Sequence, residues 1–275
     1  IYIEEEDSVA LAAKSVRAEK GKVNIAVILL RHLSNFTDFN VLERDPRVHL
    51  FYTNNVDELA KADVILLPGS KSTLDDLYEL RRNGVAAAII RAHREGATVM
   101  GICGGYQMLG QSLSDPEGVE DGGSMKGLGL LPVTTTFTTE KTRTRVNGTL
   151  LHVEGNLKAL ENLKFEGYEI HMGETVLKGE AGHSVSIEDQ VSGECKEDGA
   201  YRKNVCGTYV HGVFDREDVA EAVVRVLGEK KGIDVSQMTG IDFAAFKETQ
   251  YDILAAELRK HLDMKKIYEI LEEGV

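Results

Sequence analysis

The chain has 275 residues, of which 42% are hydrophobic, and a formal net charge of −13 at pH 7. This composition is too apolar for a disordered protein and is sufficient for one large domain or two modest ones. The acidic excess argues against a sequence-wide attraction to nucleic acid or to anionic membranes, because both require a basic surface.

The cysteine count and the composition of the N-terminus indicate the cellular compartment. Cys103, Cys195 and Cys206 are odd in number and show no CxxC spacing, so we expect neither disulfides nor a metal site and infer a reducing, cytoplasmic location. No run of about 18 apolar residues is present to span a bilayer, and the opening IYIEEEDSVA is acidic where a signal peptide is basic. Residues 1–22 are expected to be a lead-in from a preceding domain.

Short apolar runs that end at turn residues predict buried strands of a parallel sheet. They are VNIAVILL at 23–30, RVHLFYT at 47–53, ADVILLPG at 62–69 and ATVMGIC at 97–103. Helices are predicted at 72–84 and 85–96, the first opening with a capping box formed by Thr73 and Asp76. This alternation predicts an α/β fold with a doubly wound, mostly parallel sheet flanked by helices, whose sites lie beyond the carboxyl ends of the strands.

Beyond about residue 126 the sequence becomes rich in threonine, valine and glycine. The pairs Asn147-Gly148 and Asp198-Gly199 are hairpin signals, so this part is predicted to add antiparallel strands. Apolar stripes between 219 and 227 and between 251 and 262 predict C-terminal helices. We expect one domain at 23–218 and a helical extension at 219–275 that packs on it.

The segment GICGGYQMLG at 101–110 places Cys103 between a predicted strand and a predicted helix. Gly101, Gly104 and Gly105 permit the tight turn that exposes a nucleophile, and the helix N-terminus favours the thiolate. The Gly104 amide is placed to donate to an oxyanion. Free cysteines are also common as small buried hydrophobic residues, so this motif by itself leaves both interpretations open.

Two further segments supply the other groups that a cysteine nucleophile needs. GTYVHGVFD at 207–215 puts His211 at the end of a strand, as a base from a distant part of the chain or as a structural histidine. LPGSKST at 67–73 lacks the spacing of a phosphate-binding loop. The Gly69 amide is instead predicted to face the thiol as a second oxyanion donor, the alternative being a simple helix-entry turn.

These three segments, together with KGLGLLPVTT at 126–135 and YEIHMG at 168–173, resemble the glutamine amidotransferase domain of the cobyric acid synthase family, within the class I (triad) amidotransferases. The resemblance spans nearly the whole chain. It implies a flavodoxin-like class I amidotransferase fold and hydrolysis of glutamine to glutamate and ammonia. The hydrolysis would proceed through a thioester on Cys103, with His211 as the base.

The resemblance also implies that the ammonia serves an ATP-dependent synthetase domain, which precedes this domain in the full-length protein. That domain would amidate carboxylates of a corrin ring, converting adenosylcobyrinic acid a,c-diamide to cobyric acid in cobalamin biosynthesis. ATP and Mg²⁺ are expected only there, and no cofactor is expected in this chain. The expected partners are glutamine, the synthetase domain and, through it, the corrin acid.

The residue that would orient the base is left open. Many class I amidotransferases carry a glutamate two residues after the catalytic histidine, whereas Val213 stands there in this sequence. Glu169 and His171 are the candidates, although they could equally brace the loop.

Other functions share most of these motifs. They are the glutaminase domain of cobyrinate a,c-diamide synthase or of a murein-lipid amidating complex, a non-catalytic regulatory module on the same fold, and a redox-sensing or hydrolytic cysteine protein.

Overall fold

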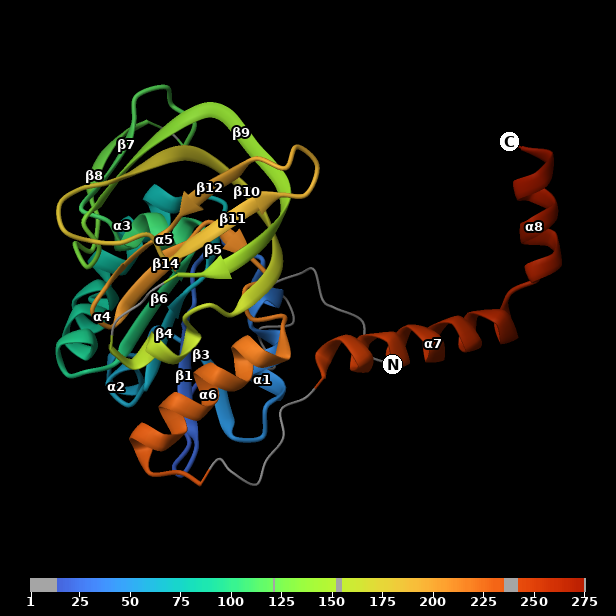
Figure 1. Cartoon of the computed structure of the whole chain (residues 1–275), viewed down its shortest axis with the longest axis horizontal. Helices are drawn as coiled ribbons and strands as arrows, with labels where there is room; N and C mark the ends of the chain where they lie inside the picture. The colour runs from blue at the N-terminus through green and yellow to red at the C-terminus, as the bar shows by residue number, and fades with distance from the viewer. Residues whose placement is uncertain (1–13, 121, 152–154, 235–241, 275) are drawn as a thin grey trace.

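The computed structural model describes residues 14–120, 122–151, 155–234 and 242–274 (Figure 1). Its first sheet has the strand order β13-β14-β6-β4-β1-β3. The strands are β1 (Val23–Ile28), β3 (Val48–Thr53), β4 (Val64–Leu67), β6 (Thr98–Ile102), β13 (Ala200–Arg202) and β14 (Val205–Thr208). Neighbours run parallel except β13 and β14, which are antiparallel. The predicted parallel sheet is confirmed.

Helices flank this sheet and explain why its strands read as continuous apolar runs. They are α1 (Asn40–Arg44), α2 (Val56–Leu59), α3 (Thr73–Arg82), α4 (Val85–Arg94), α5 (Gly104–Leu109) and α6 (Glu217–Lys231). α5 packs on β4, β6 and β14, whereas α6 packs on β1 and α1. Every residue of β1, β4 and β6 is buried as a result.

A second, largely antiparallel sheet lies above the first (Figure 1) and follows the order β12-β11-β9-β10-β15, with β7 paired to β9 and β8 paired to β7. Its strands are β7 (Ser112–Asp115), β8 (Gly123–Lys126), β9 (Val133–Leu150), β10 (Lys164–Leu177), β11 (Val185–Asp189), β12 (Cys195–Asp198) and β15 (Val210–His211). The short strands β2 (Leu33–Ser34) and β5 (Gly69–Ser70) pair separately, and 3-10 turns occupy Phe36–Phe39 and Gly155–Leu160. The predicted antiparallel addition is therefore present.

The two hairpin signals turn out differently from the prediction. Asn147 and Gly148 lie inside β9, so the turn predicted there is wrong. A Cβ on Gly148 would come 2.1 Å from the Phe165 ring, so this glycine permits a close cross-strand contact instead. Gly199 does turn the chain, with φ +70°, but it leads from β12 in the second sheet to β13 in the first.

The capping box predicted for α3 is also wrong. The Asp76 carboxylate, 1% exposed, accepts a hydrogen bond from Ser70 Oγ (2.6 Å) and from the backbone amides of residues 31 and 32. The first amides of α3, those of Thr73 and Leu74, donate instead to Glu120, which lies far along the chain. The cap of α3 is therefore a tertiary contact.

The two ends of the chain pack to different degrees. Residues 1–13 of the expected lead-in lie outside the described residues. The Ser15 carbonyl oxygen accepts a hydrogen bond from the amide of Tyr52 in β3 (2.8 Å). At the other end α6 is well packed, and α7 (Phe243–His261) contacts the body through Phe243 and Phe246.

The helix α8 (Met264–Glu273) has no buried residue among its ten, and α7 and α8 project away from the sheets (Figure 1). Within the expected extension at 219–275, α6 therefore packs on the domain, whereas α8 buries none of its residues.

Candidate active site

Cys103 lies at the turn between β6 and α5, as the motif predicted. Its backbone adopts φ 51° and ψ −111°, a conformation that residues with a side chain rarely occupy. The turn depends on its glycines: a Cβ on Gly105 would lie 2.0 Å from the Leu67 carbonyl oxygen, and one on Gly101 would lie 2.7 Å from Gly105. The thiol is 8% exposed and lies 3.6 Å from the Ile170 carbonyl oxygen.

His211 ends β15 beside this cysteine and is held by a buried aspartate. The Asp38 carboxylate, 4% exposed, lies 2.7 Å from His211 Nδ1 through Oδ2 and accepts a hydrogen bond from the Gly212 amide (3.0 Å) through Oδ1. On the other side of the ring, the Asn35 amide nitrogen lies 3.0 Å from Nε2, and the Tyr168 ring stacks at 5.1 Å. The imidazole therefore has a fixed orientation.

The charges of this pair follow from their surroundings. Burial on its own lowers the pKa of His211, but the Asp38 carboxylate and the contact with Cys103 raise it to about 10. His211 is therefore protonated at neutral pH, and an imidazolium beside a thiol favours the thiolate. Cys206 differs, because burial raises the pKa of its thiol to about 12.

The predicted orienting residues, Glu169 and His171, pair with each other instead of with His211. Glu169 Oε1 lies 3.5 Å from His171 Nε2, and Lys196 Nζ lies 2.9 Å from Glu169 Oε2, close enough for an ion pair but without hydrogen-bond geometry. The His171 ring stacks on Tyr209 at 3.7 Å. The position that the sequence interpretation gave to these two residues is filled by Asp38.

The predicted oxyanion donors come together at the same place. A Cβ on Gly104 would lie 2.9 Å from the Ser70 nitrogen, and a Cβ on Gly69 would lie 3.4 Å from His211 Cε1. The turn at 69–70 and the start of α5 therefore face each other beside the thiol. The first amides of a helix lack partners within the helix, which leaves the Gly104 N–H able to bind an anion.

A pocket of about 410 Å³ opens onto Cys103, within the size range of small-molecule sites. It is formed by the turns after β2 and β5, the loop after β7 and the strands β9 and β10. Its lining residues are Ser34, Asn35, Ser70, Lys71, Thr73, Cys103, Gln107, Val119, Glu120, Phe137, Lys141, Ile170, His171 and Met172.

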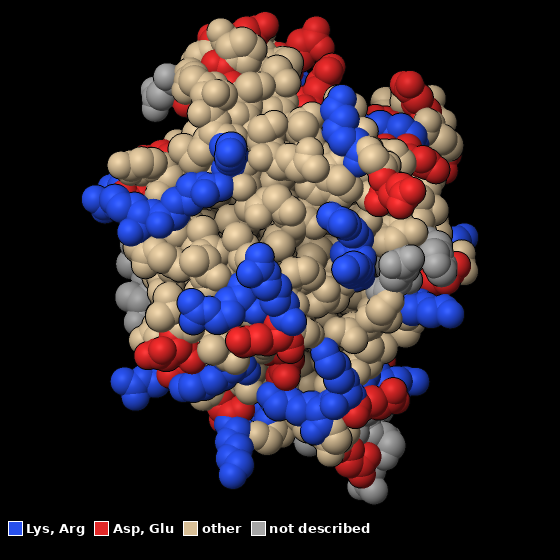
Figure 2. Space-filling view, turned by 90° about the vertical axis from the view of Figure 1, so that its left-hand side faces the viewer, with Lys and Arg blue, Asp and Glu red and all other residues tan. Residues whose placement is uncertain are grey.

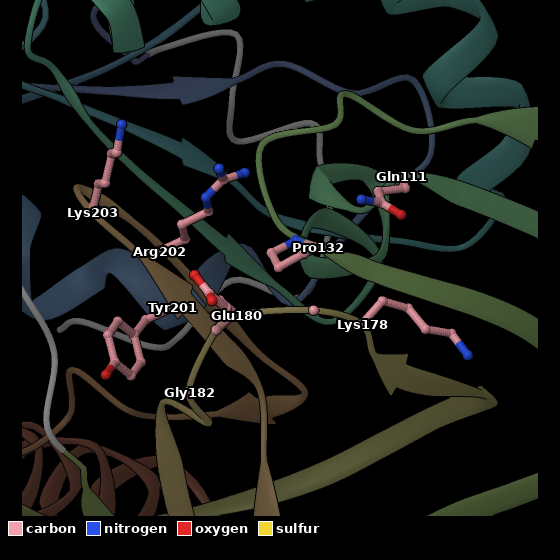
Figure 3. Close-up of a pocket in the computed structure, with 10 residues that line it drawn as sticks. Gln111, Pro132, Lys178, Glu180, Gly182, Tyr201, Arg202 and Lys203 are labelled. Carbon is pink, nitrogen blue, oxygen red and sulfur yellow. The ribbon is translucent and has the colours of Figure 1, made fainter.

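A larger hollow of about 1010 Å³ lies elsewhere and shares no lining residue with this pocket. Figure 3 shows Lys178, Arg202 and Lys203 around it, with Glu180 between them. On the face in Figure 2, basic side chains stand among uncharged ones, so the net charge of −13 does not form a continuous acidic surface there. The larger hollow has no cysteine or histidine in its lining, so it does not contain the cysteine and histidine pair found beside Cys103.

The described part of the chain contains no group of three or more His, Cys, Asp or Glu side chains that could hold a metal ion. None of the described helices is long and apolar enough to cross a membrane.

The sequence interpretation missed Asp38, Asn35 and Glu120. The first two lie in the polar stretch SNFTDF at 34–39, close after the predicted strand at 23–30. Because polar residues just beyond a parallel strand lie at the edge of the sheet where sites form, that position was the available signal. Glu120 lies in a loop whose path the sequence pattern does not predict.

The chain is similar in sequence to known proteins. A family model described as the CobB/CobQ-like glutamine amidotransferase domain matches residues 24–219. Cobyric acid synthase from Bacteroides fragilis is 56% identical over 276 residues, which cover 100% of this chain and 52% of that protein. Cobyric acid synthase from Lachnoclostridium phytofermentans is 45% identical over 286 residues, which cover 100% and 55%. The chain therefore spans about half the length of these curated relatives.

Solved structures support the same fold. PurLQS from Thermotoga maritima superposes with a TM-score of 0.56 at 18% identity, covering 76% of this chain and 99% of that chain. A structure described as a glutamine amidotransferase gives a TM-score of 0.51 at 16% identity, covering 74% and 98%. The predicted class I amidotransferase fold is confirmed. With the family model across most of its length and relatives at 45–56% identity, the chain belongs to the CobB/CobQ-like glutamine amidotransferase domains.

Proposed function

We propose that this chain hydrolyses glutamine at a Cys103–His211–Asp38 triad and supplies the ammonia to an ATP-dependent synthetase domain of the same full-length protein. The observation that carries the proposal is the buried Asp38–His211 contact of 2.7 Å beside a cysteine at a strained strand-to-helix turn. That arrangement brings a nucleophile, a base and an orienting carboxylate together.

In the first half of the reaction the Cys103 thiolate attacks the side-chain amide carbon of glutamine and forms a carbon–sulfur bond. The resulting oxyanion accepts hydrogen bonds from the Gly104 amide and from the turn containing Gly69 and Ser70. When the carbon–nitrogen bond breaks, the proton on His211 Nε2 passes to the leaving nitrogen. Ammonia leaves, and a thioester remains on Cys103.

In the second half a water molecule attacks the thioester and gives its proton to the now neutral His211. The same amides hold the second oxyanion, the carbon–sulfur bond breaks, and glutamate is released with the thiolate restored. Asp38 keeps Nδ1 of the ring engaged throughout, so that Nε2 is the nitrogen that exchanges protons. Over the complete cycle one glutamine and one water give glutamate and ammonia, and the Cys103 thiolate and the His211 imidazolium are restored.

For the whole protein we propose amidation of corrin-ring carboxylates, from adenosylcobyrinic acid a,c-diamide to cobyric acid, in cytoplasmic cobalamin biosynthesis. The support is that the cited relatives, all named cobyric acid synthase, are about twice as long as this chain and leave room for a synthetase domain. ATP and Mg²⁺ belong to that domain in this proposal. The same relatives favour it over a cobyrinate a,c-diamide synthase or a murein-lipid amidating complex.

Labelling with the glutamine analogue 6-diazo-5-oxo-L-norleucine tests the glutaminase. We expect Cys103 to be alkylated in preference to Cys206, whose thiol stays protonated, and to exposed Cys195. Equal labelling of the three cysteines would contradict the proposal. ATP-dependent amidation of a corrin acid should appear only when the synthetase domain is present, and amidation by the 275-residue chain alone would refute the division of labour.

A further inference from the structure

The helices α7 and α8 form a C-terminal arm that projects away from the two sheets (Figure 1). In α7 the side chains of Tyr251, Leu254 and Leu258 follow one another at spacings of three and four residues, which places them on one face of the helix. Tyr251 is 45% exposed and Leu258 is 46% exposed. A helix that packs on a globular domain buries such a face, so this one has no facing surface in the described structure.

The helix α8 continues the same pattern. Met264, Ile267, Tyr268 and Leu271 lie on one face, and none of the ten residues of α8 is buried. Tyr268 is 55% exposed and Leu271 is 72% exposed. A helix of this length is only marginally stable in water unless one face packs against another surface. Exposed apolar faces of this kind are typical of helices that dock on a protein partner.

The similarity to longer proteins indicates where that partner lies. The family model ends at residue 219, so α7 and α8 lie outside the residues that it matches. The alignment with cobyric acid synthase from Bacteroides fragilis nevertheless covers 100% of this chain at 56% identity, and therefore includes the arm. The arm is thus shared with a protein about twice as long as this chain, beyond the matched glutaminase domain.

The start of the arm lies beside the point where the described chain begins. The Arg44 guanidinium carbon, at the end of α1, lies 4.5 Å from the centroid of the Phe246 ring and 6.0 Å from that of Phe243. The preceding residue of α1, Glu43, accepts a hydrogen bond from Lys14 Nζ (2.7 Å). Neighbouring residues of α1 therefore contact both the first described residue and the first turn of α7.

This position brings the whole arm within reach of a domain that precedes residue 1. The polypeptide of residues 1–13 can span at most about 45 Å. The 19 residues of α7 extend over about 28 Å, and the ten residues of α8 over about 15 Å. A domain attached through residues 1–13 can therefore contact the apolar faces of both helices.

We propose that the C-terminal arm docks on the ATP-dependent synthetase domain of the same full-length protein through the apolar faces of α7 and α8. The inference rests on the proposed function, which supplies that domain. None of the described residues that line the pocket beside Cys103 belongs to the arm. Docking through the arm therefore attaches the two domains without covering that pocket.

Hydrogen exchange of the α8 amides tests this in the full-length protein and in the 275-residue chain. In the 275-residue chain these amides should exchange within about tenfold of the rate of an unfolded peptide, because no residue of α8 is buried. In the full-length protein exchange should be about 100-fold slower or more. Equal exchange in the two proteins would overturn the proposal. Protection that increases with protein concentration would show that a second copy covers the face, and would overturn it as well.

The variant Leu271→Glu identifies the face that makes the contact. Leucine and glutamate have similar helix propensities, so a loss of protection in the full-length variant reports a lost contact. We expect the α8 amides to exchange as fast as they do in the 275-residue chain. Lys266→Glu, on the opposite face of α8, is the matched control and should keep the protection. Equal exchange in the two variants would contradict docking through the apolar face.

Labelling with 6-diazo-5-oxo-L-norleucine distinguishes this inference from the glutaminase proposal. Leu271→Glu in the 275-residue chain should leave the labelling rate of Cys103 unchanged, because the arm does not line the pocket. A labelled Cys103 with an unprotected arm in the full-length protein rejects the docking alone. A protected arm with an unlabelled Cys103 rejects the glutaminase alone.

Discussion

Cys103 and His211 belong to the same site but are supported by different parts of the chain. The cysteine depends on residues within a few positions of it, since Gly101 and Gly105 allow its strained turn. The histidine depends on Asp38 and Asn35, which lie 173 and 176 residues away in sequence. The nucleophile is therefore a local structure, whereas the base is a tertiary one.

This difference predicts how the two halves of the site respond to change. A local turn is sensitive to sterics, because backbone and side-chain atoms already touch. A tertiary base is sensitive to charge, because the Asp38 carboxylate is what offsets the burial of an imidazolium. Substitutions can test each half separately.

The largest effect is expected at the nucleophile. Cys103→Ser should lower glutaminase activity by about 10⁴-fold or more, because a hydroxyl is far less ionised than a thiol at neutral pH. Cys195→Ser, on an exposed strand, is the control and should be neutral. Ammonia release from glutamine is the measurement, and activity near that of the unmodified chain would remove Cys103 from the mechanism.

Substitution of the base should lower the glutaminase activity nearly as much. His211→Asn should lower the same rate by about 10³- to 10⁴-fold, since members of one catalytic unit fail together. The double variant with Cys103→Ser should be little worse than either single one. Additive losses in the double variant would show that the two residues do not act as a unit.

The same contrast explains which features of the fold and the site could be predicted from the sequence. The strands at 23–30, 62–69 and 97–103 and the turn at Cys103 were predictable, because their signals lie in neighbouring residues. Asp38 had only its position after a predicted strand as a signal and Glu120 had none, since each acts across a fold whose loops the pattern does not describe. The turn predicted at Asn147-Gly148 was wrong for a related reason. The sequence alone does not distinguish a glycine that permits close contact with Phe165 from a glycine that forms a turn.

The substitution Asp38→Asn tests the support of the base, which depends on tertiary contacts, by removing a charge. It should lower kcat by about 10²- to 10⁴-fold, because a neutral amide stabilises the imidazolium poorly. The pKa of His211 should fall from about 10 toward its ordinary 6.5, so the alkaline limb of the rate profile moves to lower pH. An alkaline limb that stays in place would show that Asp38 does not set this pKa.

The same aspartate should change how stability depends on pH. A raised folded-state pKa stabilises the unmodified chain fully below pH 6.5, and this contribution is lost as pH rises through about 10. Urea unfolding of Asp38→Asn should show a weaker dependence across that range. Asp57→Asn, on the exposed start of α2, should behave as the unmodified chain does.

The substitution Gly105→Ala tests the turn that carries the nucleophile by adding a methyl group at a close backbone contact. A Cβ there would lie 2.0 Å from the Leu67 carbonyl oxygen, so the strand and the helix must separate. We expect unfolding in urea to become easier by about 3 kcal/mol, at the upper end of overpacking costs. Gly21→Ala adds a methyl group in open space at φ +86° and should cost only about 1 kcal/mol, from the backbone alone. Equal losses in the two variants would mean that the turn at Cys103 is not tightly packed.

The smallest effects are expected at Glu169 and His171, which pair with each other and not with the base. Glu169→Gln removes a buried charge whose partners are His171 and exposed Lys196, and His171→Asn removes the stack on Tyr209. Because Asp38 still fixes the His211 ring in both variants, kcat should fall by less than about tenfold. The alkaline limb of the rate profile should not move. If His171→Asn were as damaging as Cys103→Ser while His211→Asn were mild, His171 would be the base and His211 would not. The contacts of His211 with Asp38 and Asn35 would then serve only to stabilise the fold.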